Sequence, residues 1–107
     1  VLEDVSVISR DDFSLAMLAK MVGSNTKYVS MVINDTYGKN FKTYLNEFRI
    51  REACRRLSDT KYYGNMTIQA IYEELGYKTA SSFVKAFRKI NGMTPSQYQK
   101  LKSQLAE

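Results

Sequence analysis

The amino-acid sequence predicts an all-α fold in which two helix-turn-helix lobes are joined by a long central helix. The first observation behind this prediction is a repeat. Apolar residues and glycines recur at the same steps in both halves, offset by 53 residues up to Gly76 and by 54 from the next turn onward, as in a duplicated helical unit. The first copy contains Leu15, Leu18, Gly23, Val29, Ile33 and Gly38. The second copy contains Ile68, Ile71, Gly76, Phe83, Phe87 and Gly92.

The second observation is the segment between the copies, residues 41–57, which carries two apolar stripes. At about 100° per residue, these stripes lie on opposite sides of a helix. One consists of Phe41, Tyr44, Leu45 and Phe48, and the other of Ile50, Ala53, Cys54 and Leu57. A helix that packs on a single core needs only one stripe, so we expect each half of this helix to pack on a different lobe.

The chain divides into four expected segments. Residues 1–12 are acidic, lack a clear period and are expected to form a linker or tail. Residues 13–38 form the first helix-turn-helix lobe, and residues 39–58 form the central connecting helix. Residues 59–107 form the second lobe with a C-terminal helix. Between the two halves of the chain, the stretch from Ser58 to Asn65 is expected to be a loop.

Each lobe begins with the same helix-start pattern. Phe13-Ser14 precedes the first helix, where Ser14 caps the free backbone amides and Phe13 packs on the helix as a hydrophobic staple. Met66-Thr67 repeats this arrangement in the second half. The two lobes are therefore expected to start in the same way.

Each first helix is expected to end in a tight turn that leads into a second helix. Gly23 and Gly76 suit the left-handed conformation that terminates a helix. Asn25 and Thr79 then cap the second helices. The order of helix, glycine turn and helix predicts a helix-turn-helix in each half.

A last helix is expected to start at Thr94. Thr94 caps it, Pro95 occupies the first turn, where no amide donor is needed, and Gln97 bonds back to the cap. Tyr98 and Leu101 are expected to anchor this helix on the second lobe.

The second helix of each lobe is expected to have an inward apolar face and an outward polar face. In the first lobe the inward residues are Val29, Val32 and Ile33, and the outward ones are Lys27, Met31 and Asn34, with Ser30 at the margin. In the second lobe the inward residues are Phe83, Ala86, Phe87 and Ile90, and the outward ones are Ser81, Ser82, Lys85, Arg88 and Lys89.

The net charge of +5 is unevenly distributed. Residues 1–12 carry one basic and four acidic side chains, a net −3, while residues 13–107 carry 15 basic and 7 acidic side chains, a net +8. A basic body favours a polyanionic partner, most often nucleic acid. Charge alone does not separate that interpretation from an ordinary solvated surface.

The composition argues against several other classes. There is no histidine and only one cysteine, so the commonest metal ligand and general base is missing and no disulfide can form within the chain. Cys54 is expected to be a small buried side chain. We expect neither a cofactor nor a metal, and no enzyme, because no constellation of residues carries chemistry. No apolar run approaches a membrane span, and the start at Val1 suggests a C-terminal fragment of a longer protein.

These residues resemble the DNA-binding domain of AraC/XylS-type transcription regulators over nearly all of residues 13–100. The most specific part resembles the family's second helix-turn-helix: Ile68, Ile71, Gly76-Tyr77, Ser82-Phe83, Phe87-Arg88-Lys89, Gly92 and Thr94-Pro95-Ser96-Gln97-Tyr98. The first unit and the connecting helix are matched at Leu18-Ala19, Gly23, Tyr44-Leu45, Arg49 and Ala53.

The resemblance implies sequence-specific binding of double-stranded DNA in transcription regulation, with two recognition helices in successive major grooves. It implies a cytoplasmic domain, an upstream sensor or dimerisation domain that is membrane-anchored in some relatives, and RNA polymerase as a candidate second partner. The fragment alone is expected to be a monomer. The alternative function is a basic helical module that binds another protein.

Two departures from the family pattern bear on this expectation. The family usually has a small residue where this chain has Tyr72, as Ala19 is in the first lobe. The helix is therefore rotated, the lobe is opened, or the Tyr72 ring points outward. In the first recognition helix, Ile33 replaces a usual phenylalanine, and Met31 stands where a basic or polar residue is common. These replacements make base recognition by the first lobe the harder to predict.

The outward residues of the two recognition helices are the candidate DNA contacts. Lys27 and Lys85 can meet bases or phosphates or merely solubilise the surface, and Ser81 and Ser82 suit base edges or phosphates. Met31 can contact a thymine methyl group or be an ordinary exposed apolar residue. For Arg49, on neither apolar stripe, we expect a salt bridge between the lobes in preference to DNA.

Overall fold

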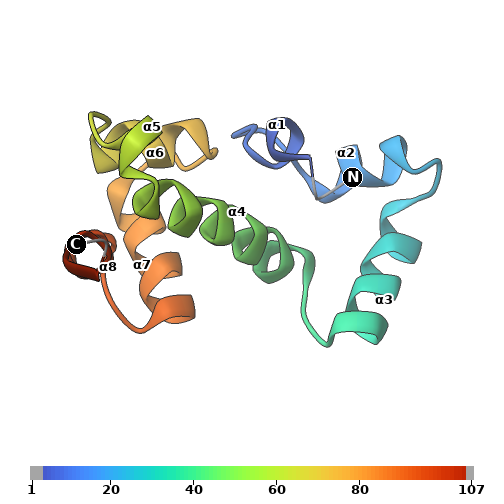
Figure 1. Cartoon of the computed structure of the whole chain (residues 1–107). Coiled ribbons are helices and arrows are strands. Elements are labelled where there is room, and N and C mark those ends of the chain that lie inside the picture. Colours follow the sequence, from blue (N-terminus) through green and yellow to red (C-terminus); the bar gives the residue numbers. More distant parts are fainter. Residues whose placement is uncertain (1–3, 106–107) are drawn as a thin grey trace.

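In a computed structural model that describes residues 4–105, every regular element is a helix, which confirms the all-α prediction (Figure 1). The described residues extend over 47 × 23 × 23 Å. None of their helices is both long and apolar enough to cross a membrane. In chain order the helices are α1 (Val5–Ile8), α2 (Leu15–Met21), α3 (Thr26–Tyr37), α4 (Phe41–Ser58), α5 (Thr60–Tyr63), α6 (Ile68–Glu74), α7 (Ala80–Asn91) and α8 (Pro95–Leu105).

The central helix α4 runs between two separate hydrophobic cores, as its two stripes predicted. Figure 1 shows α3 towards one end of the molecule and α7 towards the other, with α4 between them. Leu45, in the first half of α4, belongs to the first core with Leu18 and Ile33. Ile50, Ala53 and Leu57, in its second half, belong to the second core with Ile71, Tyr72, Leu75, Tyr77, Phe83 and Phe87. The helix therefore stabilises both lobes at once.

Side-chain caps begin the helices at the predicted residues. Ser14 accepts a hydrogen bond from the Met17 amide at 3.2 Å, and Thr67 accepts one from Ala70 at 3.0 Å. The recognition helices α3 and α7 begin in the same way, at Asn25 and Thr79. Before α8, the amide of Gln97 donates to Thr94 Oγ1 at 3.1 Å, and that of Thr94 donates to Gln97 Oε1 at 2.9 Å. This reciprocal pair is the predicted capping box.

The two turns share a backbone conformation but differ in their surroundings. Gly23 has φ +72° and Gly76 has φ +93°, both in the left-handed region that favours glycine. A Cβ atom added at Gly23 would meet nothing within 4 Å. One added at Gly76 would lie 2.9 Å from the carbonyl oxygen of Ser9 and 3.0 Å from that of Arg10. Only the second turn is packed against another part of the chain.

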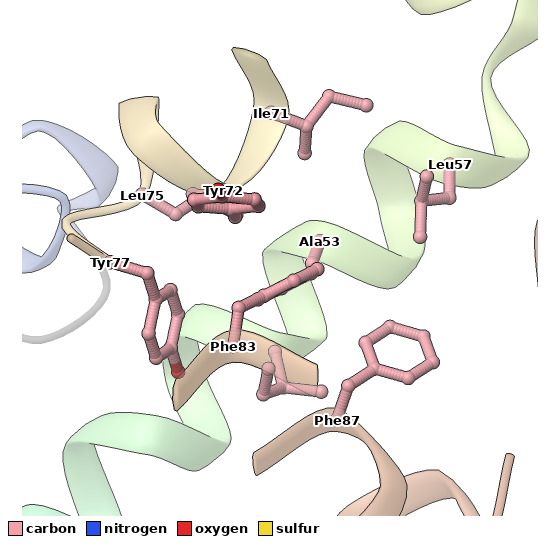
Figure 2. Close-up of a cluster of buried hydrophobic side chains, with 9 residues drawn as sticks. Ala53, Leu57, Ile71, Tyr72, Leu75, Tyr77, Phe83 and Phe87 are labelled. Carbon is pink, nitrogen blue, oxygen red and sulfur yellow. The ribbon is translucent and has the colours of Figure 1, made fainter. Parts of the chain in front are cut away.

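The Tyr72 ring points inward. Its residue is only 7% exposed, and its ring lies 5.3 Å from that of Phe83 with an interplanar angle of 29°. Figure 2 shows the two rings facing each other within the second core. The second lobe therefore fills with an aromatic ring the place where the first lobe has the buried Ala19.

The segment 1–12, expected to be an acidic linker or tail, packs on the first core through its described residues. Asp4 caps the short helix α1, and Ile8 is 2% exposed within the first core. A helix of four residues is too short to produce a readable apolar period, which is why the sequence did not reveal it. Residues 1–3 lie outside the described part of the chain.

The loop expected from Ser58 to Asn65 contains helix α5, which Asp59 caps. Three residues that were expected to be buried are exposed. Val32 and Ile90, expected to face inward, are 39% and 43% exposed, and Leu101, expected to anchor the last helix, is 41% exposed. Val32 lies on the flank of its buried stripe, and Ile90 lies in the last turn of α7, beyond the centre of the core. Tyr98 does anchor α8, with its ring 5.5 Å from that of Phe87.

Cys54 is half-buried, and not fully buried as expected. It packs against the second core, and its Sγ accepts a hydrogen bond from Asn91 Nδ2 at 3.4 Å.

Candidate nucleic-acid interface

The recognition helices α3 and α7 have the same length and the same boundaries relative to the repeat. Each has 12 residues, begins at a side-chain cap and ends at a glycine with positive φ. With the offset of 54 residues, Met31 is equivalent to Lys85 and Asn34 is equivalent to Arg88. Differences between the lobes can therefore be compared residue by residue.

The outward face of α7 is strongly basic. Ser81, Ser82, Lys85, Arg88 and Lys89 are all exposed, as predicted. Within residues 4–105, none of the three cations has a hydrogen bond or an ion pair. Ser82 Oγ lies 2.9 Å from Thr79 Oγ1 and 3.1 Å from the Thr79 carbonyl oxygen, so part of its bonding capacity is used by the helix cap.

The outward face of α3 is more apolar. Lys27, Met31 and Asn34 are exposed, and Ser30 is half-buried, which agrees with the marginal position predicted for it. Met31 is 51% exposed and Tyr28 is 54% exposed. Tyr28 is not among the contact residues predicted from the sequence. Its equivalent in the repeat, Ser82, is among them. Comparing the two copies position by position would have identified it.

Some basic side chains elsewhere are paired with carboxylates inside the molecule. Arg55 and Arg56 of α4 both hydrogen-bond Glu52, at 2.7 Å each, and Arg56 also reaches Glu74 at 3.0 Å. The hydrogen bond from Arg55, followed by that from Arg56, lowers the pKa of the Glu52 carboxyl despite its burial. The cations of α7, by contrast, remain available to an external anion.

Arg49 does not form the predicted salt bridge between the lobes. It is 8% exposed, and its Nε and Nη2 donate to the carbonyl oxygens of Ile8 and Arg10 at 2.6 and 2.7 Å. Its guanidinium also lies 5.5 Å from the centre of the Tyr77 ring, a cation–π contact. Burial lowers the pKa of Arg49. The expected tie between the lobes exists, but backbone carbonyls of the N-terminal segment take the place of a carboxylate.

No cluster of three or more His, Cys, Asp or Glu side chains within residues 4–105 is arranged to hold a metal ion.

Two helix-turn-helix units on a shared helix, with unpaired cations on the exposed face of one recognition helix, define a DNA-binding domain. Comparison with known proteins identifies its family. The family described as "Helix-turn-helix domain" matches residues 18–101, and the chain belongs to that family, in its AraC type. It is a sequence-specific DNA-binding domain of transcription regulation.

Among curated relatives, the chain is 29% identical over 91 residues to the uncharacterised HTH-type transcriptional regulator YtdP of Bacillus subtilis. It is 32% identical over 89 residues to an uncharacterised HTH-type transcriptional regulator of Staphylococcus aureus. These matches cover 85% and 83% of this chain but only 11% of each relative. The chain thus spans about a tenth of the length of the curated relatives it matches.

Solved structures agree with this assignment. The C-terminal domain of AraT, a response regulator from Geobacillus stearothermophilus, is 30% identical with a TM-score of 0.77, covering 88% of this chain and 74% of that one. A DNA-binding transcriptional dual regulator from Escherichia coli K-12 has a TM-score of 0.80 at 22% identity, covering 92% of this chain and 83% of that one. The second likeness supports the fold alone.

Proposed function

We propose that α3 and α7 enter two successive major grooves on one face of double-stranded DNA. The observation that carries this proposal is the unpaired, exposed basic face of α7 on a recognition helix that has a counterpart, α3, in the other lobe. The long dimension of 47 Å accommodates two helices separated by one DNA turn, about 34 Å.

In this proposal the two lobes contribute different contacts. The second recognition helix supplies most of the electrostatic attraction to phosphates, and the first supplies short-range contacts to bases. The contacting residues are Lys27, Ser30, Met31 and Asn34 in the first lobe and Ser81, Ser82, Lys85, Arg88 and Lys89 in the second.

The test is a salt titration of duplex binding by the variants Lys85→Ala, Arg88→Ala and Met31→Ala, on a selected site and on a scrambled duplex. Each lost phosphate contact should flatten the slope of log affinity against log salt by up to about one unit. We expect this for Lys85→Ala and Arg88→Ala, while Met31→Ala leaves the slope unchanged. If Lys85 binds a guanine edge, its loss should also relax specificity at one position. The reverse pattern of slopes would show that the DNA-facing surface is placed wrongly.

The alternative function, a basic module that binds another protein, predicts a different result for the unmodified chain. Binding to duplex would then be weak on every sequence, and no selected site would be preferred over the scrambled one. The same titration therefore decides between the two functions before any variant is made.

The rest of the longer protein is proposed to carry the sensor and the dimerisation surface. The similarity to the C-terminal domain of AraT, a response regulator, supports such an arrangement. The domain would then act in the cytoplasm, where bacterial DNA lies, with RNA polymerase as a second partner. The chain alone should be a monomer that binds one asymmetric site weakly. A stable dimer in sedimentation at micromolar concentration would contradict this.

A further inference from the structure

A groove of about 730 Å³ lies between the first half of α4 on one side and α7 with the turn before it on the other. Its lining includes Leu45, which belongs to the first core, and Tyr77, which belongs to the second, so the groove lies between the two lobes. Lys85 and Lys89 of α7 also line it, and they belong to the outward face of the second recognition helix. The groove is therefore continuous with the proposed DNA-binding face.

The walls of this groove are basic. Four lysines line it, Lys42, Lys78, Lys85 and Lys89, against one acidic residue, Asp11. All four lysines are exposed, and none has a hydrogen bond or ion pair within the described residues. The neighbouring Asp12 carries a charge as well, but Arg10 binds it with two hydrogen bonds of 3.1 and 3.0 Å. The groove thus keeps a surplus of positive charge for an external anion.

The floor of the groove is held in place by polar contacts between the lobes. The Tyr77 hydroxyl donates to Asn46 Oδ1 at 2.7 Å, across 31 residues of sequence. Within residues 4–105 the Asn46 amide nitrogen donates no hydrogen bond, so it remains a donor in the groove. Arg49 lines the same groove and donates hydrogen bonds to the carbonyl oxygens of Ile8 and Arg10 in the N-terminal segment.

We propose that this groove binds the DNA sugar-phosphate backbone between the two half-sites, an inference that rests on the proposed function. When two helices occupy successive major grooves on one face, the strands that border the intervening minor groove pass the middle of the protein. In this molecule the middle consists of α4 and the groove. Cations and amide donors suit phosphate oxygens, which position a duplex without reading its sequence.

The experiment uses Lys42→Ala and Lys78→Ala, because neither residue belongs to the outward face of a recognition helix. The matched control is Lys100→Ala, an exposed lysine on α8 outside the groove. Each groove variant should flatten the salt slope by up to about one unit, equally on the selected site and on the scrambled duplex. The control should leave the slope unchanged. Asp11→Asn should strengthen binding to both duplexes because it removes a repelling charge.

Phosphate ethylation interference locates the contact. For the unmodified chain, ethylation of phosphates between the half-sites should weaken binding, and this interference should be lost in Lys42→Ala combined with Lys78→Ala. If Lys85→Ala and Arg88→Ala flatten the slope while Lys42→Ala and Lys78→Ala behave like Lys100→Ala, the groove inference is wrong and the proposed function stands. A chain that shows no salt-dependent duplex binding would overturn both.

Discussion

The two lobes repeat one backbone plan but use its turn differently. The turn at Gly23 is open to solvent, whereas the turn at Gly76 is packed against the carbonyl groups of Ser9 and Arg10. Arg49 hydrogen-bonds this same N-terminal segment. Two copies of one backbone plan can therefore have different surroundings. At the second turn, the N-terminal segment, the central helix and the second lobe are in contact with one another.

The recognition helices differ in the same asymmetric way. At equivalent steps, α7 presents Lys85 and Lys89, whereas α3 presents Met31 and the acidic Asp35. We therefore expect long-range attraction to DNA to come mainly from the second lobe, because charge acts over about 10 Å while apolar contacts act only at contact distance. Four predictions test this comparison between the lobes.

The largest effect is expected at the position where the cores differ most. Tyr72→Ala should destabilise the chain by about 3–5 kcal/mol, because it removes a buried ring stacked on Phe83. Thermal or denaturant unfolding measures this. Tyr72→Phe is the matched control and should cost less than about 1 kcal/mol, since the hydroxyl has no described hydrogen bond. An alanine variant as stable as the unmodified chain would show that the ring does not support the second core.

The next effect compares the two turns directly. Gly76→Ala should destabilise by about 2–4 kcal/mol, because a Cβ would add backbone strain and collide with the Ser9 and Arg10 carbonyls. Gly23→Ala adds only the strain of positive φ, about 1–2 kcal/mol. Denaturant unfolding of both variants gives the difference. Equal losses would mean that packing of the N-terminal segment adds nothing at the second turn.

A smaller effect should appear at alkaline pH through Tyr77, which lies in the second lobe. Burial raises the pKa of Tyr77 from its ordinary value of 10.0 to about 12. Because the folded pKa is the higher one, the stabilisation is fully present below pH 10 and is lost as the pH rises from 10 to 12. The loss at pH 11 should be about 1 kcal/mol.

Tyr77→Phe isolates this effect from the other tyrosines. At neutral pH the variant should lose about 1 kcal/mol with the hydrogen bond to Asn46, but its further loss between pH 9 and pH 11 should be smaller than that of the unmodified chain. Parallel stability curves for the two proteins over that range would contradict the assignment. The first lobe has Ser24 at the equivalent step and offers no such titration.

The smallest effect concerns the first recognition helix. Met31→Ala should alter preference at one or two base pairs by about 1 kcal/mol, as loss of an apolar contact to a thymine methyl group would. Competition binding on single-substituted sites measures this. A uniform loss of affinity on all sequences would mean that Met31 positions the helix instead of reading a base.

Much of this fold is predictable because its signals are local. Caps at Ser14, Asn25 and Thr79 and glycines at the turns act within a few residues, and the repeat confirms each signal by a second occurrence. The two stripes of residues 41–57 likewise followed from helical geometry. For the candidate site, the outward residues of α7 were predictable for the same reason.

The remaining features depend on contacts between distant parts of the chain. Arg49 and Ile8 are 41 residues apart, and no periodicity links a side chain to a carbonyl group at that separation. The orientation of Tyr72 depends on Phe83, in a different helix. The exposed Val32 shows that the width of a buried stripe is set by the neighbouring helices and not by the pattern alone.

The way Arg49 holds the N-terminal segment has a consequence for substitutions in the chain. Its guanidinium donates hydrogen bonds to backbone carbonyl oxygens, which every amino acid carries. The side chain of Arg10 can therefore be substituted without removing this hydrogen bond. Arginine itself is not replaceable in the same way, because the single ammonium of a lysine lacks the planar fork that reaches two acceptors. A substitution of Arg49 should therefore weaken this joint more than a substitution of the exposed Arg10, whose contribution is a backbone carbonyl.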